Sequence, residues 1–491
     1  MCRITLAILT LINLQVQSHT FRAAVVEYPF SAIPDANPRK IMLQNAKRYE
    51  EYVIKAAQQK AEIIIFPEYG LTTWAALNKT RDTIQPFLQH IPERNHWNPC
   101  TDAEIPAQNN EILVLLSCMA KNNSIVVAAN LLTQEKCDKN DETKCFHFNT
   151  NVIISQNGTI LGTYHKTHLF NEESFLDIPS QAQYSTIDAG FARISTFTCF
   201  DIDFYEPAVE IILEKSVKNI IFTSSWNSEL PFSLAPQVFE KAGLGSGIYS
   251  SQLGALNEFY DLSSTKFLIV ADVPVNPSPV PNNNFDRVAS CSSSPPEIIS
   301  NYSTKPFIMS EKPSSKFSSN IHKIYYQNLN NFSIIHLHGL QREMSINSSD
   351  VCCHVTYKLR KENFSEGYYS LLAYDGFREY GNYKWPIQVC SVVWCRSQNG
   401  VEICGQVEEM GINVSFEFLS LVGIFTTEAV FPSVINSNLK NVNIIEFQLL
   451  DSVLAIFLFD IISENKEKKS SYTTDYNLWL HAIVNATATC S

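Results

Sequence analysis

Apolar runs alternate with amphipathic stretches along the first half of this chain, and the alternation limits the folds that are open to it. Residues 62–66 read Glu-Ile-Ile-Ile-Phe and stop at Pro67, a pattern typical of a fully buried strand. Before this run, Asn37 is placed to cap a helix that has Pro38 at its first position. One buried face of that helix is predicted by apolar residues at helical spacing, namely Met42, Ala46, Tyr49, Val53 and Ala56.

The same rhythm continues toward residue 224. Strand–helix alternation of this kind indicates a layered α/β domain. The sequence predicts strands over 21–27, 125–129, 194–198 and 220–224, helices over 111–121 and 206–215, and a hairpin of 152–154 with 159–164 around Asn157-Gly158.

A change of composition near residue 271 marks a second region. Residues 274–320 are rich in Pro, Ser and Asn, and we predict a linker or long loop there. Beyond them, apolar and polar residues alternate as in half-buried strands, and 453–459 form a further apolar run. We therefore expect an α/β domain over 19–273 and a smaller, mostly antiparallel β domain with disulfides over 321–491.

The amino-terminal residues have the pattern of a secretory signal peptide. Arg3 supplies a positive charge, residues 4–14 are apolar but too few to span a bilayer, and Val16-Gln17-Ser18 fits a cleavage site. We therefore expect residues 1–18 to be removed and the chain to be secreted, with no transmembrane segment and no evident lipid anchor. Secretion also agrees with the Asn-x-Ser/Thr sequons, which are candidate glycosylation sites at Asn78, Asn122, Asn157, Asn301, Asn331, Asn347, Asn363, Asn413 and Asn485.

The cysteines also fit an oxidising compartment, where disulfides persist. The chain has 13 of them. Cys137 and Cys145 flank a polar loop and are a candidate pair. The Cys390-x4-Cys395 spacing could be read as part of a zinc site, but we favour a disulfide framework. The second cluster that we expect to be disulfide-bonded contains Cys352, Cys353, Cys390, Cys395 and Cys404.

Charge and missing motifs narrow the class of partner. The formal net charge is −12, and no long basic run is present. Nucleic-acid binding depends on clustered Lys and Arg, so we do not expect a nucleic acid as a partner. The chain has neither a His-Glu-x-x-His motif nor a phosphate-binding glycine loop, and we expect no metal ion and no cofactor.

Three reactive side chains each lie just past a predicted strand or at its end. They are Glu68, Lys166 and Cys199. Strand ends in α/β proteins collect catalytic groups, because the sheet holds them rigidly. We therefore predict that the three side chains meet in one site.

These residue types meet the needs of amide hydrolysis by a cysteine. A free thiol has a pKa of about 8.5, so Cys199 needs a base, and Glu68 can accept its proton. Lys166 would stabilise the thiolate and then the tetrahedral oxyanion, with the backbone N–H of Phe200 as a second donor. The predicted scheme is covalent: a thioester forms on Cys199, and a water activated by Glu68 hydrolyses it.

Each of these residues also has a purely structural interpretation. Taken alone, Glu68 and Lys166 would be surface or salt-bridged charges, and Cys199 would be a core thiol or half of a disulfide. His165 and His168 flank Lys166 and offer an alternative base, although Glu68 already fills that role. The three contexts together favour the catalytic interpretation.

The three segments resemble the Glu–Lys–Cys motifs of the nitrilase (carbon–nitrogen hydrolase) superfamily, and the chain resembles its vanin/biotinidase branch of secreted amidases. The resemblance implies an αββα sandwich followed by a β-rich domain. It also implies hydrolysis of a small-molecule amide, either pantetheine or a biotin amide. Glu172 matches the superfamily's second glutamate, which supports the lysine and the pocket. Beyond the triad, the resemblance is carried by residues 116–125, 198–202, 245–249, 352–358 and 373–376.

The chain departs from this branch after Pro236. There the branch carries a helix and a core strand, whereas this chain reaches Gly245 almost directly. By the same resemblance, the missing segment supplies part of the sandwich and one wall of the substrate pocket. The departure motivates a second hypothesis, in which the chain is a catalytically impaired secreted glycoprotein that acts as a binding module.

Overall fold

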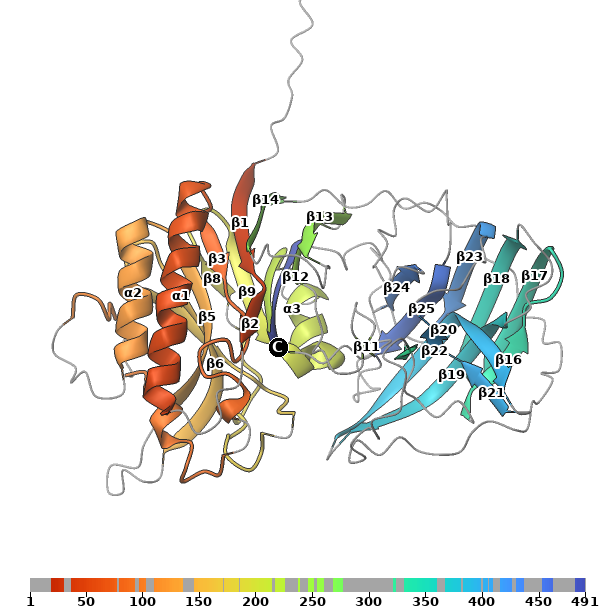
Figure 1. Ribbon diagram of the computed structural model, residues 1–491, viewed down its shortest axis with the longest axis horizontal. Coiled ribbons are helices and arrows are strands. Elements are labelled where there is room, and N and C mark those ends of the chain that lie inside the picture. Colours follow the sequence, from red (N-terminus) through yellow and green to blue (C-terminus); the bar gives the residue numbers. More distant parts are fainter. Residues whose placement is uncertain are drawn as a thin grey trace, which may run out of the picture.

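The computed structural model describes most of the first region and the strands of the second (Figure 1). The predicted signal peptide and nearly all of the predicted linker lie outside the described residues. The described residues are 19–30, 37–76, 79–92, 97–102, 110–135, 145–170, 172–184, 186–213, 217–225, 237–238, 246–250, 254–259, 268–276, 321–323, 331–359, 367–380, 383–398, 401–404, 406–408, 416–425, 430–436, 453–461 and 482–490.

The first sheet is built mainly from the amino-terminal region. Its strands are β1 (Thr20–Val26), β3 (Ile63–Ile65), β4 (Gln89–His90), β5 (Val126–Glu135), β6 (Phe146–Ile154), β7 (Ile160–His165) and β14 (Leu268–Pro274). Their order is β14-β1-β3-β5-β6-β7, and β4 also pairs with β5. β1, β3 and β5 are parallel, whereas β6 is antiparallel to both β5 and β7. The carboxyl ends of β3, β5 and β7 therefore lie at the same edge of the sheet.

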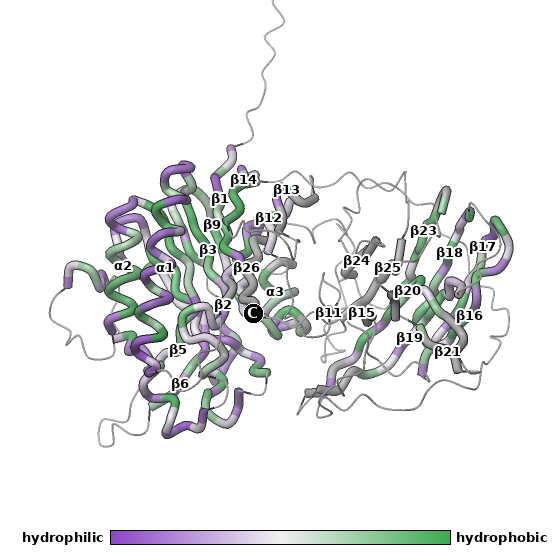
Figure 2. Tube along the Cα trace, viewed as in Figure 1, coloured by the Kyte–Doolittle hydropathy of each residue, from purple (hydrophilic) through white to green (hydrophobic). Residues whose placement is uncertain are grey.

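Two helices cover one face of this sheet, α1 (Pro38–Gln58) and α2 (Glu111–Asn123) (Figure 1). The side chain of Asn37 accepts a hydrogen bond from Lys40 N at 3.3 Å, as expected for an N-cap. All five apolar residues predicted to face the core from α1 are buried. Hydrophobic and hydrophilic stretches alternate along both helices in Figure 2, because only one side of each helix packs on the sheet.

The second sheet packs against the first. Its strands are β2 (Tyr28–Phe30), β8 (Thr186–Asp188), β9 (Arg193–Thr198), β10 (Asn219–Ser224), β12 (Ser246–Ser250), β13 (Gly254–Phe259) and β26 (Ala482–Cys490). Their order is β13-β12-β26-β10-β9-β8, and β2 also pairs with β26. β9, β10 and β26 are parallel, which places their carboxyl ends together.

Three apolar layers separate these elements. Side chains alternate along the strands, so Ala24 and Ile64 face α1 and α2, whereas Val25 and Ile65 face the second sheet. A third layer on the outer side of the second sheet includes Ile211 of α3 (Glu210–Leu213). The order of layers is helix, sheet, sheet, helix, which confirms the predicted αββα sandwich.

Strand β26 differs from the expected division of the chain. Residues 482–490 were expected in the β-rich domain, but β26 lies between β10 and β12 in the second sheet. Of the described strands that follow Pro236, β11 pairs with β15, and β12 pairs with β13 and β26. An unpaired strand edge exposes backbone N–H and C=O groups, and β26 pairs with six residues of β10 from Asn219 to Ser224.

The helix predicted over 206–215 begins later than expected. A π-helical turn (Tyr205–Val209) precedes α3. Glu206 inside that turn has an extended backbone with φ −98° and ψ 124°, and its peptide bond to Pro207 is cis. The proline ring disfavours helical backbone angles at the residue before it, here Glu206. The regular helix therefore begins only at Glu210. The other short helices are the 3₁₀ turns Trp74–Ala76, Gln85–Phe87 and Cys199–Asp203.

The second region contains two antiparallel sheets that share one apolar core. The first has the order β16-β19-β20-β25-β24 with β21 beside β20, and the second is β17-β18-β23. A separate small sheet joins β11 (Gln237–Val238), β15 (Ile321–Lys323) and β22 (Gln406–Glu408). The bounds of the two larger sheets are β16 (Ser333–His336), β17 (Gln341–Ser348), β18 (Val351–Leu359), β19 (Tyr368–Tyr380), β20 (Tyr383–Gln398), β21 (Val401–Cys404), β23 (Phe416–Ile424), β24 (Val430–Asn436) and β25 (Val453–Ile461).

Disulfides are present within each of the two regions. Cys353–Cys390 links β18 to β20 across the core, and Cys395–Cys404 links β20 to β21. Cys390 and Cys395 are therefore halves of two disulfides, and the zinc interpretation of their spacing is wrong. Cys145 and Cys352 are also disulfide-bonded. Cys137, the candidate partner of Cys145, lies outside the described residues.

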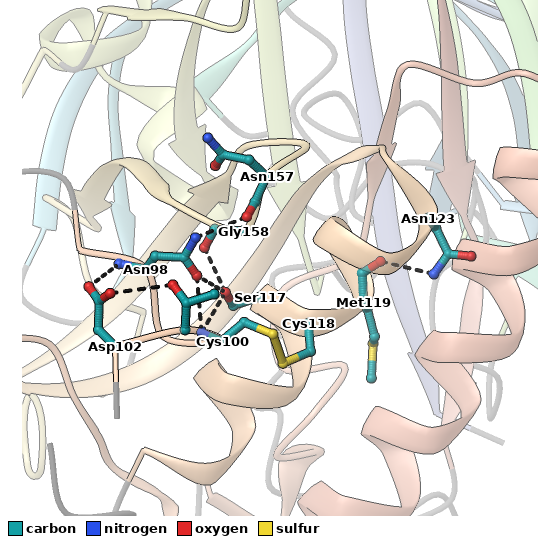
Figure 3. Close-up of a disulfide and its surroundings, with 10 residues drawn as sticks. Asn98, Cys100, Asp102, Ser117, Cys118, Met119, Asn123, Asn157 and Gly158 are labelled. Carbon is teal, nitrogen blue, oxygen red and sulfur yellow. Dashed lines mark hydrogen bonds between the residues drawn. A yellow bond between two sulfur atoms is a disulfide. The ribbon is translucent and has the colours of Figure 1, made fainter. Parts of the chain in front are cut away.

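A third disulfide, Cys100–Cys118, was not paired from the sequence (Figure 3). It joins the loop before α2 to the helix itself. The neighbouring Ser117 Oγ donates to the carbonyl of Gly158 at 2.6 Å, which attaches the hairpin turn to the same place. Across the described segments, no helix is both long enough and apolar enough to cross a bilayer.

Candidate active site

The three predicted catalytic residues meet where the strand ends of both sheets converge. Glu68 lies in the turn after β3, Lys166 follows β7 and Cys199 follows β9. Each residue as a whole is nearly inaccessible to solvent, with Glu68 at 1% exposed, Lys166 at 2% and Cys199 at 6%. The structure thus brings together residues that are far apart in the sequence.

Lys166 links two carboxylates. Its Nζ atom lies 2.9 Å from Glu68 Oε1 and 3.0 Å from Glu172 Oε2. Glu172, which was expected to support the lysine, therefore contacts it directly. Buried ammonium and carboxylate groups need such partners, because an unpaired charge in the interior is costly.

Glu68 also lies beside Cys199, the predicted nucleophile. The Cys199 thiol is close enough to the Glu68 carboxylate for each group to shift the pKa of the other. The other carboxylate oxygen, Oε2, accepts from the backbone N–H of Ser225 at 2.9 Å, just past β10. Cys199 is a free thiol among the described cysteines. The glutamate is therefore held between the amine, the thiol and the second sheet.

The pKa values of the site describe a neutral thiol beside a base. Burial raises the pKa of Glu68 above its ordinary value, although Lys166 opposes the shift. Burial and the nearby Glu68 raise the pKa of the Cys199 thiol well above its ordinary value. Burial alone would lower the pKa of Lys166, but Glu172 and Glu68 outweigh it and raise that pKa. At neutral pH the resting site holds Lys166 as ammonium and Cys199 as thiol.

The backbone at Cys199 adopts an unusual conformation. Its φ is +47°, in the left-handed region that residues with a side chain seldom occupy. The residue stands where β9 turns into the 3₁₀ helix Cys199–Asp203. Phe200 follows it, is buried and packs edge-on against Phe170. The predicted use of the Phe200 N–H as an oxyanion donor stays a prediction.

The two histidines proposed as an alternative base have other partners. His165 Nε2 lies 3.2 Å from Glu135 Oε2, and its Nδ1 lies 2.9 Å from Thr150 Oγ1. His168 Nδ1 lies 3.1 Å from Asp201 Oδ1. The proximity of Cys199 to the Glu68 carboxylate favours Glu68 as the base.

Two further site residues were missed from the sequence. Asn149 Nδ2 donates to Glu68 Oε1 at 2.8 Å and to Glu172 Oε1 at 3.1 Å. The Tyr69 hydroxyl donates to the Glu172 carboxylate. The backbone N–H of Tyr69 donates to Asn130 Oδ1 at 3.2 Å. Burial, followed by the neighbouring carboxylates, raises the pKa of Tyr69 well above its ordinary value, so the phenol remains a donor.

These polar groups continue into a network between the sheets. Asn130 Nδ2 donates to Asn149 Oδ1 at 2.6 Å and to Asn151 Oδ1 at 3.1 Å. Asn151 in turn bonds Thr196 of β9 and Thr223 of β10, each at 2.8 Å. A signal for this network is in the sequence, because Asn149 and Asn151 share one face of a strand that continues into the apolar run 152–154. Buried networks of this kind hold side chains in fixed positions.

The sequons fall on different kinds of structure. Asn122, Asn157 and Asn331 are exposed, and Asn347 is half-buried. Asn485 lies within β26, which pairs on both sides. Asn78, Asn301, Asn363 and Asn413 lie outside the described residues. Within the described part of the chain, no three His, Cys, Asp or Glu side chains gather as a metal site would require.

Known proteins share both regions of this chain. The carbon-nitrogen hydrolase family matches residues 23–243, and the vanin C-terminal domain matches residues 322–473. Human biotinidase is 30% identical over 469 residues, which cover 86% of this chain and 83% of that protein. Mouse pantetheinase is 29% identical over 457 residues, covering 86% of this chain and 82% of that protein.

Proposed function

Because the chain belongs to the vanin/biotinidase branch of the carbon–nitrogen hydrolase (nitrilase) superfamily, we propose that it hydrolyses a linear carboxamide through a thioester on Cys199. The enzyme class is that of hydrolases acting on carbon–nitrogen bonds other than peptide bonds. The observation that carries the mechanism is the position of Glu68, which bonds the Lys166 ammonium and lies beside the Cys199 thiol.

The first half of the reaction begins from the neutral thiol. Glu68 takes the thiol proton as Cys199 Sγ attacks the carbonyl carbon of the amide, which forms a tetrahedral intermediate. Lys166 provides positive charge for the oxygen on which negative charge develops, and the Phe200 N–H is the second proposed donor. When the intermediate collapses, the C–N bond breaks, and Glu68 passes its proton to the departing amine. A thioester remains on Cys199.

The second half uses the same groups with water. Glu68 takes a proton from a water molecule, whose oxygen attacks the thioester carbon. The carbon–sulfur bond then breaks, the carboxylic acid leaves, and the proton returns from Glu68 to the Cys199 sulfur. Since Glu68 ends in its starting state, one glutamate serves as base and acid in both halves.

The substrate class follows from the relatives, of which one is named for pantetheine and another for biotin. We propose pantetheine, which would give pantothenate and cysteamine, or a biotin amide. Both are linear secondary amides with a small polar amine as leaving group. The match over the vanin C-terminal domain supports this branch over other amidases.

The test is incubation of the purified chain with pantetheine and with a biotin amide, followed by measurement of the released amine. Hydrolysis of either amide that disappears in a folded Cys199→Ala variant would support the proposal. Trapping of a labelled acyl group on Cys199 at low pH would identify the thioester. If the folded wild-type chain releases no amine from either substrate, the hypothesis of an impaired binding module replaces this one.

We also propose that the chain is secreted and glycosylated. The signal-peptide pattern and the exposed sequons at Asn122, Asn157 and Asn331 support this. Expression in cultured animal cells should place the protein in the medium, and an endoglycosidase should lower its apparent mass. Retention in the cell with an unchanged mass after enzyme treatment would contradict the proposal.

A further inference from the structure

The side chain of Asp201 is bonded on both of its oxygens and is completely buried. Oδ2 accepts from Thr198 N at 3.1 Å and from the Tyr164 hydroxyl at 2.6 Å. Oδ1 accepts from Thr167 N at 3.1 Å and from His168 N at 2.8 Å. The imidazole Nδ1 of His168 lies 3.1 Å from the same oxygen.

These bonds divide between two segments that carry catalytic residues. Thr198 directly precedes Cys199, and Thr167 directly follows Lys166. The bond to Thr198 is the ordinary capping bond of a helix start, since Asp201 is the third residue of the 3₁₀ helix. The bonds to Thr167 and His168 are not part of any cap, because they cross to a loop more than thirty positions earlier in the chain.

The two segments need such a connection. Cys199 holds a left-handed backbone conformation that its neighbours must maintain. Lys166 follows the last residue of β7, beyond the regular ladder with β6, although its own N–H still donates to Asn149 O at 2.8 Å. Just after Lys166, Asp201 Oδ1 accepts hydrogen bonds from two consecutive backbone N–H groups, those of Thr167 and His168.

We propose that Asp201 is a positioning residue that holds the Cys199 turn and the Lys166 loop at a fixed separation, a role that rests on the proposed function. Asp201 does not touch the reacting atoms. It acts through Thr198 and Thr167, so that the sulfur, the ammonium and Glu68 stay in reacting geometry. His168 supports it from the loop, because its ring also stacks on Phe204 at 3.6 Å between centroids.

Asp201→Asn is the first test. An asparagine keeps one acceptor oxygen and replaces the other with an NH₂ donor, which must face either Thr198 N–H or the two N–H groups of the loop. One side of the connection is therefore lost in either orientation. A misplacement of about 1 Å costs on the order of 100-fold in rate, so we expect kcat per folded site to fall on the order of 100-fold while KM changes little.

Two variants separate positioning from simple stability. Tyr164→Phe removes one bond to Asp201 but leaves all of its backbone bonds, and it should retain most of the wild-type kcat. His168→Phe keeps a ring for stacking on Phe204 but loses the Nδ1 contact, and it should lower kcat by roughly 3- to 10-fold, the usual effect of one hydrogen bond. His168→Phe also decides the question if Asp201→Asn does not fold, because an unchanged kcat in this variant would then overturn the proposal.

Alkylation of Cys199 by iodoacetamide gives a readout that needs no amide substrate. Its rate as a function of pH reports how the Glu68 base and the Lys166 ammonium act on the sulfur. We expect the Asp201→Asn profile to differ from that of the wild type, whereas a merely structural residue would change the folded fraction and leave the profile of folded molecules unchanged. A wild-type profile together with a wild-type kcat per labelled site would overturn the role of Asp201. If wild-type protein hydrolyses no amide, the proposed function fails, and the alkylation profile still decides this inference.

Discussion

Lys166 Nζ lies 2.9 Å from Glu68 Oε1 inside the molecule, and both side chains are 1% exposed. A second carboxylate, that of Glu172, lies 3.0 Å from the same nitrogen. One ammonium therefore serves two buried carboxylates, and the cluster carries one negative charge when all three groups are ionised. Burial, together with this excess of negative charge, keeps the neighbouring thiol neutral at rest. The imbalance also makes the lysine important for stability as well as for rate.

Replacing Lys166 with Met should destabilise the fold. The change leaves Glu68 and Glu172 buried without their cation, and loss of one partner of a buried ion pair costs about 3–5 kcal/mol. Urea denaturation should show a corresponding decrease in the free energy of unfolding. The double variant Lys166→Met with Glu172→Gln removes one of the stranded charges and should recover part of the loss. Equal stability of the single and double variants would contradict this account.

In the pH profile of kcat/KM, the midpoint of the acid limb should lie at a higher pH than an ordinary glutamate would give. Glu68 must be ionised to accept the thiol proton, so activity is lost as the pH falls through its pKa. Burial raises that pKa above its model-compound value of about 4.5, and the midpoint of the acid limb should lie above this value. The pKa values of Cys199 and Lys166 are raised well above their ordinary values, so neither group should cause a decline below about pH 9.

The reactivity of the Cys199 thiol should depend on pH in the same way as kcat/KM. Without a preformed thiolate, alkylation of Cys199 should slow as the pH falls toward the Glu68 midpoint. Fast, pH-independent alkylation down to about pH 5 would indicate a stable thiolate and would contradict the neutral resting state.

Asn149→Asp should impair activity through charge. Asn149 donates to both carboxylates of the site, at 2.8 and 3.1 Å, and an aspartate would add a third negative group there. Like charges disfavour ionisation, so the pKa of Glu68 should rise further and the acid limb of kcat/KM should move to higher pH. Asn123→Asp is a matched control, because Asn123 bonds only within α2 in the described structure, to Met119 O at 2.9 Å. An unchanged profile for Asn149→Asp would show that the amide contributes nothing to the base.

Removing the Cys100–Cys118 disulfide should lower stability and leave the chemistry intact. The bridge closes a loop of 18 residues, and loops of about this size contribute about 3 kcal/mol through the unfolded state. The double serine variant should therefore unfold at lower urea concentration, while its kcat at 25 °C should match the wild type. The contacts around the bridge, including Ser117 Oγ to Gly158 O, do not involve the triad (Figure 3). A large loss of kcat in folded protein would contradict this separation.

The strand ends that carry the triad could be predicted because local patterns define them. An apolar run ended by Pro67 locates Glu68, and the hairpin around Asn157-Gly158 locates the strand before Lys166. The N-cap and buried face of α1 follow equally from local spacing. These features need no knowledge of which strands pair, so the sequence suffices.

The polar network could not be predicted, because its meaning depends on pairing. Asn130 of β5 lies opposite Asn151 of β6, and Asn151 meets Thr196 of β9 and Thr223 of β10 only when the two sheets pack. The pairing of Cys100 with Cys118 was missed for a related reason, since connectivity does not follow from cysteine spacing. The place of β26 is also non-local, because its partner strand Asn219–Ser224 is far away along the chain.

The position of β26 has a consequence for how the molecule is made. A ribosome delivers residues 19–276 well before it delivers 482–490, yet the sheet that carries Cys199 contains both. Until residues 482–490 have been made, β10 and β12 lack the neighbour that joins them and offer open edges to other nascent chains. The sheet that carries Cys199 is therefore completed only after the β-rich region has been made, and a polypeptide cut short before residue 482 would leave that sheet without β26.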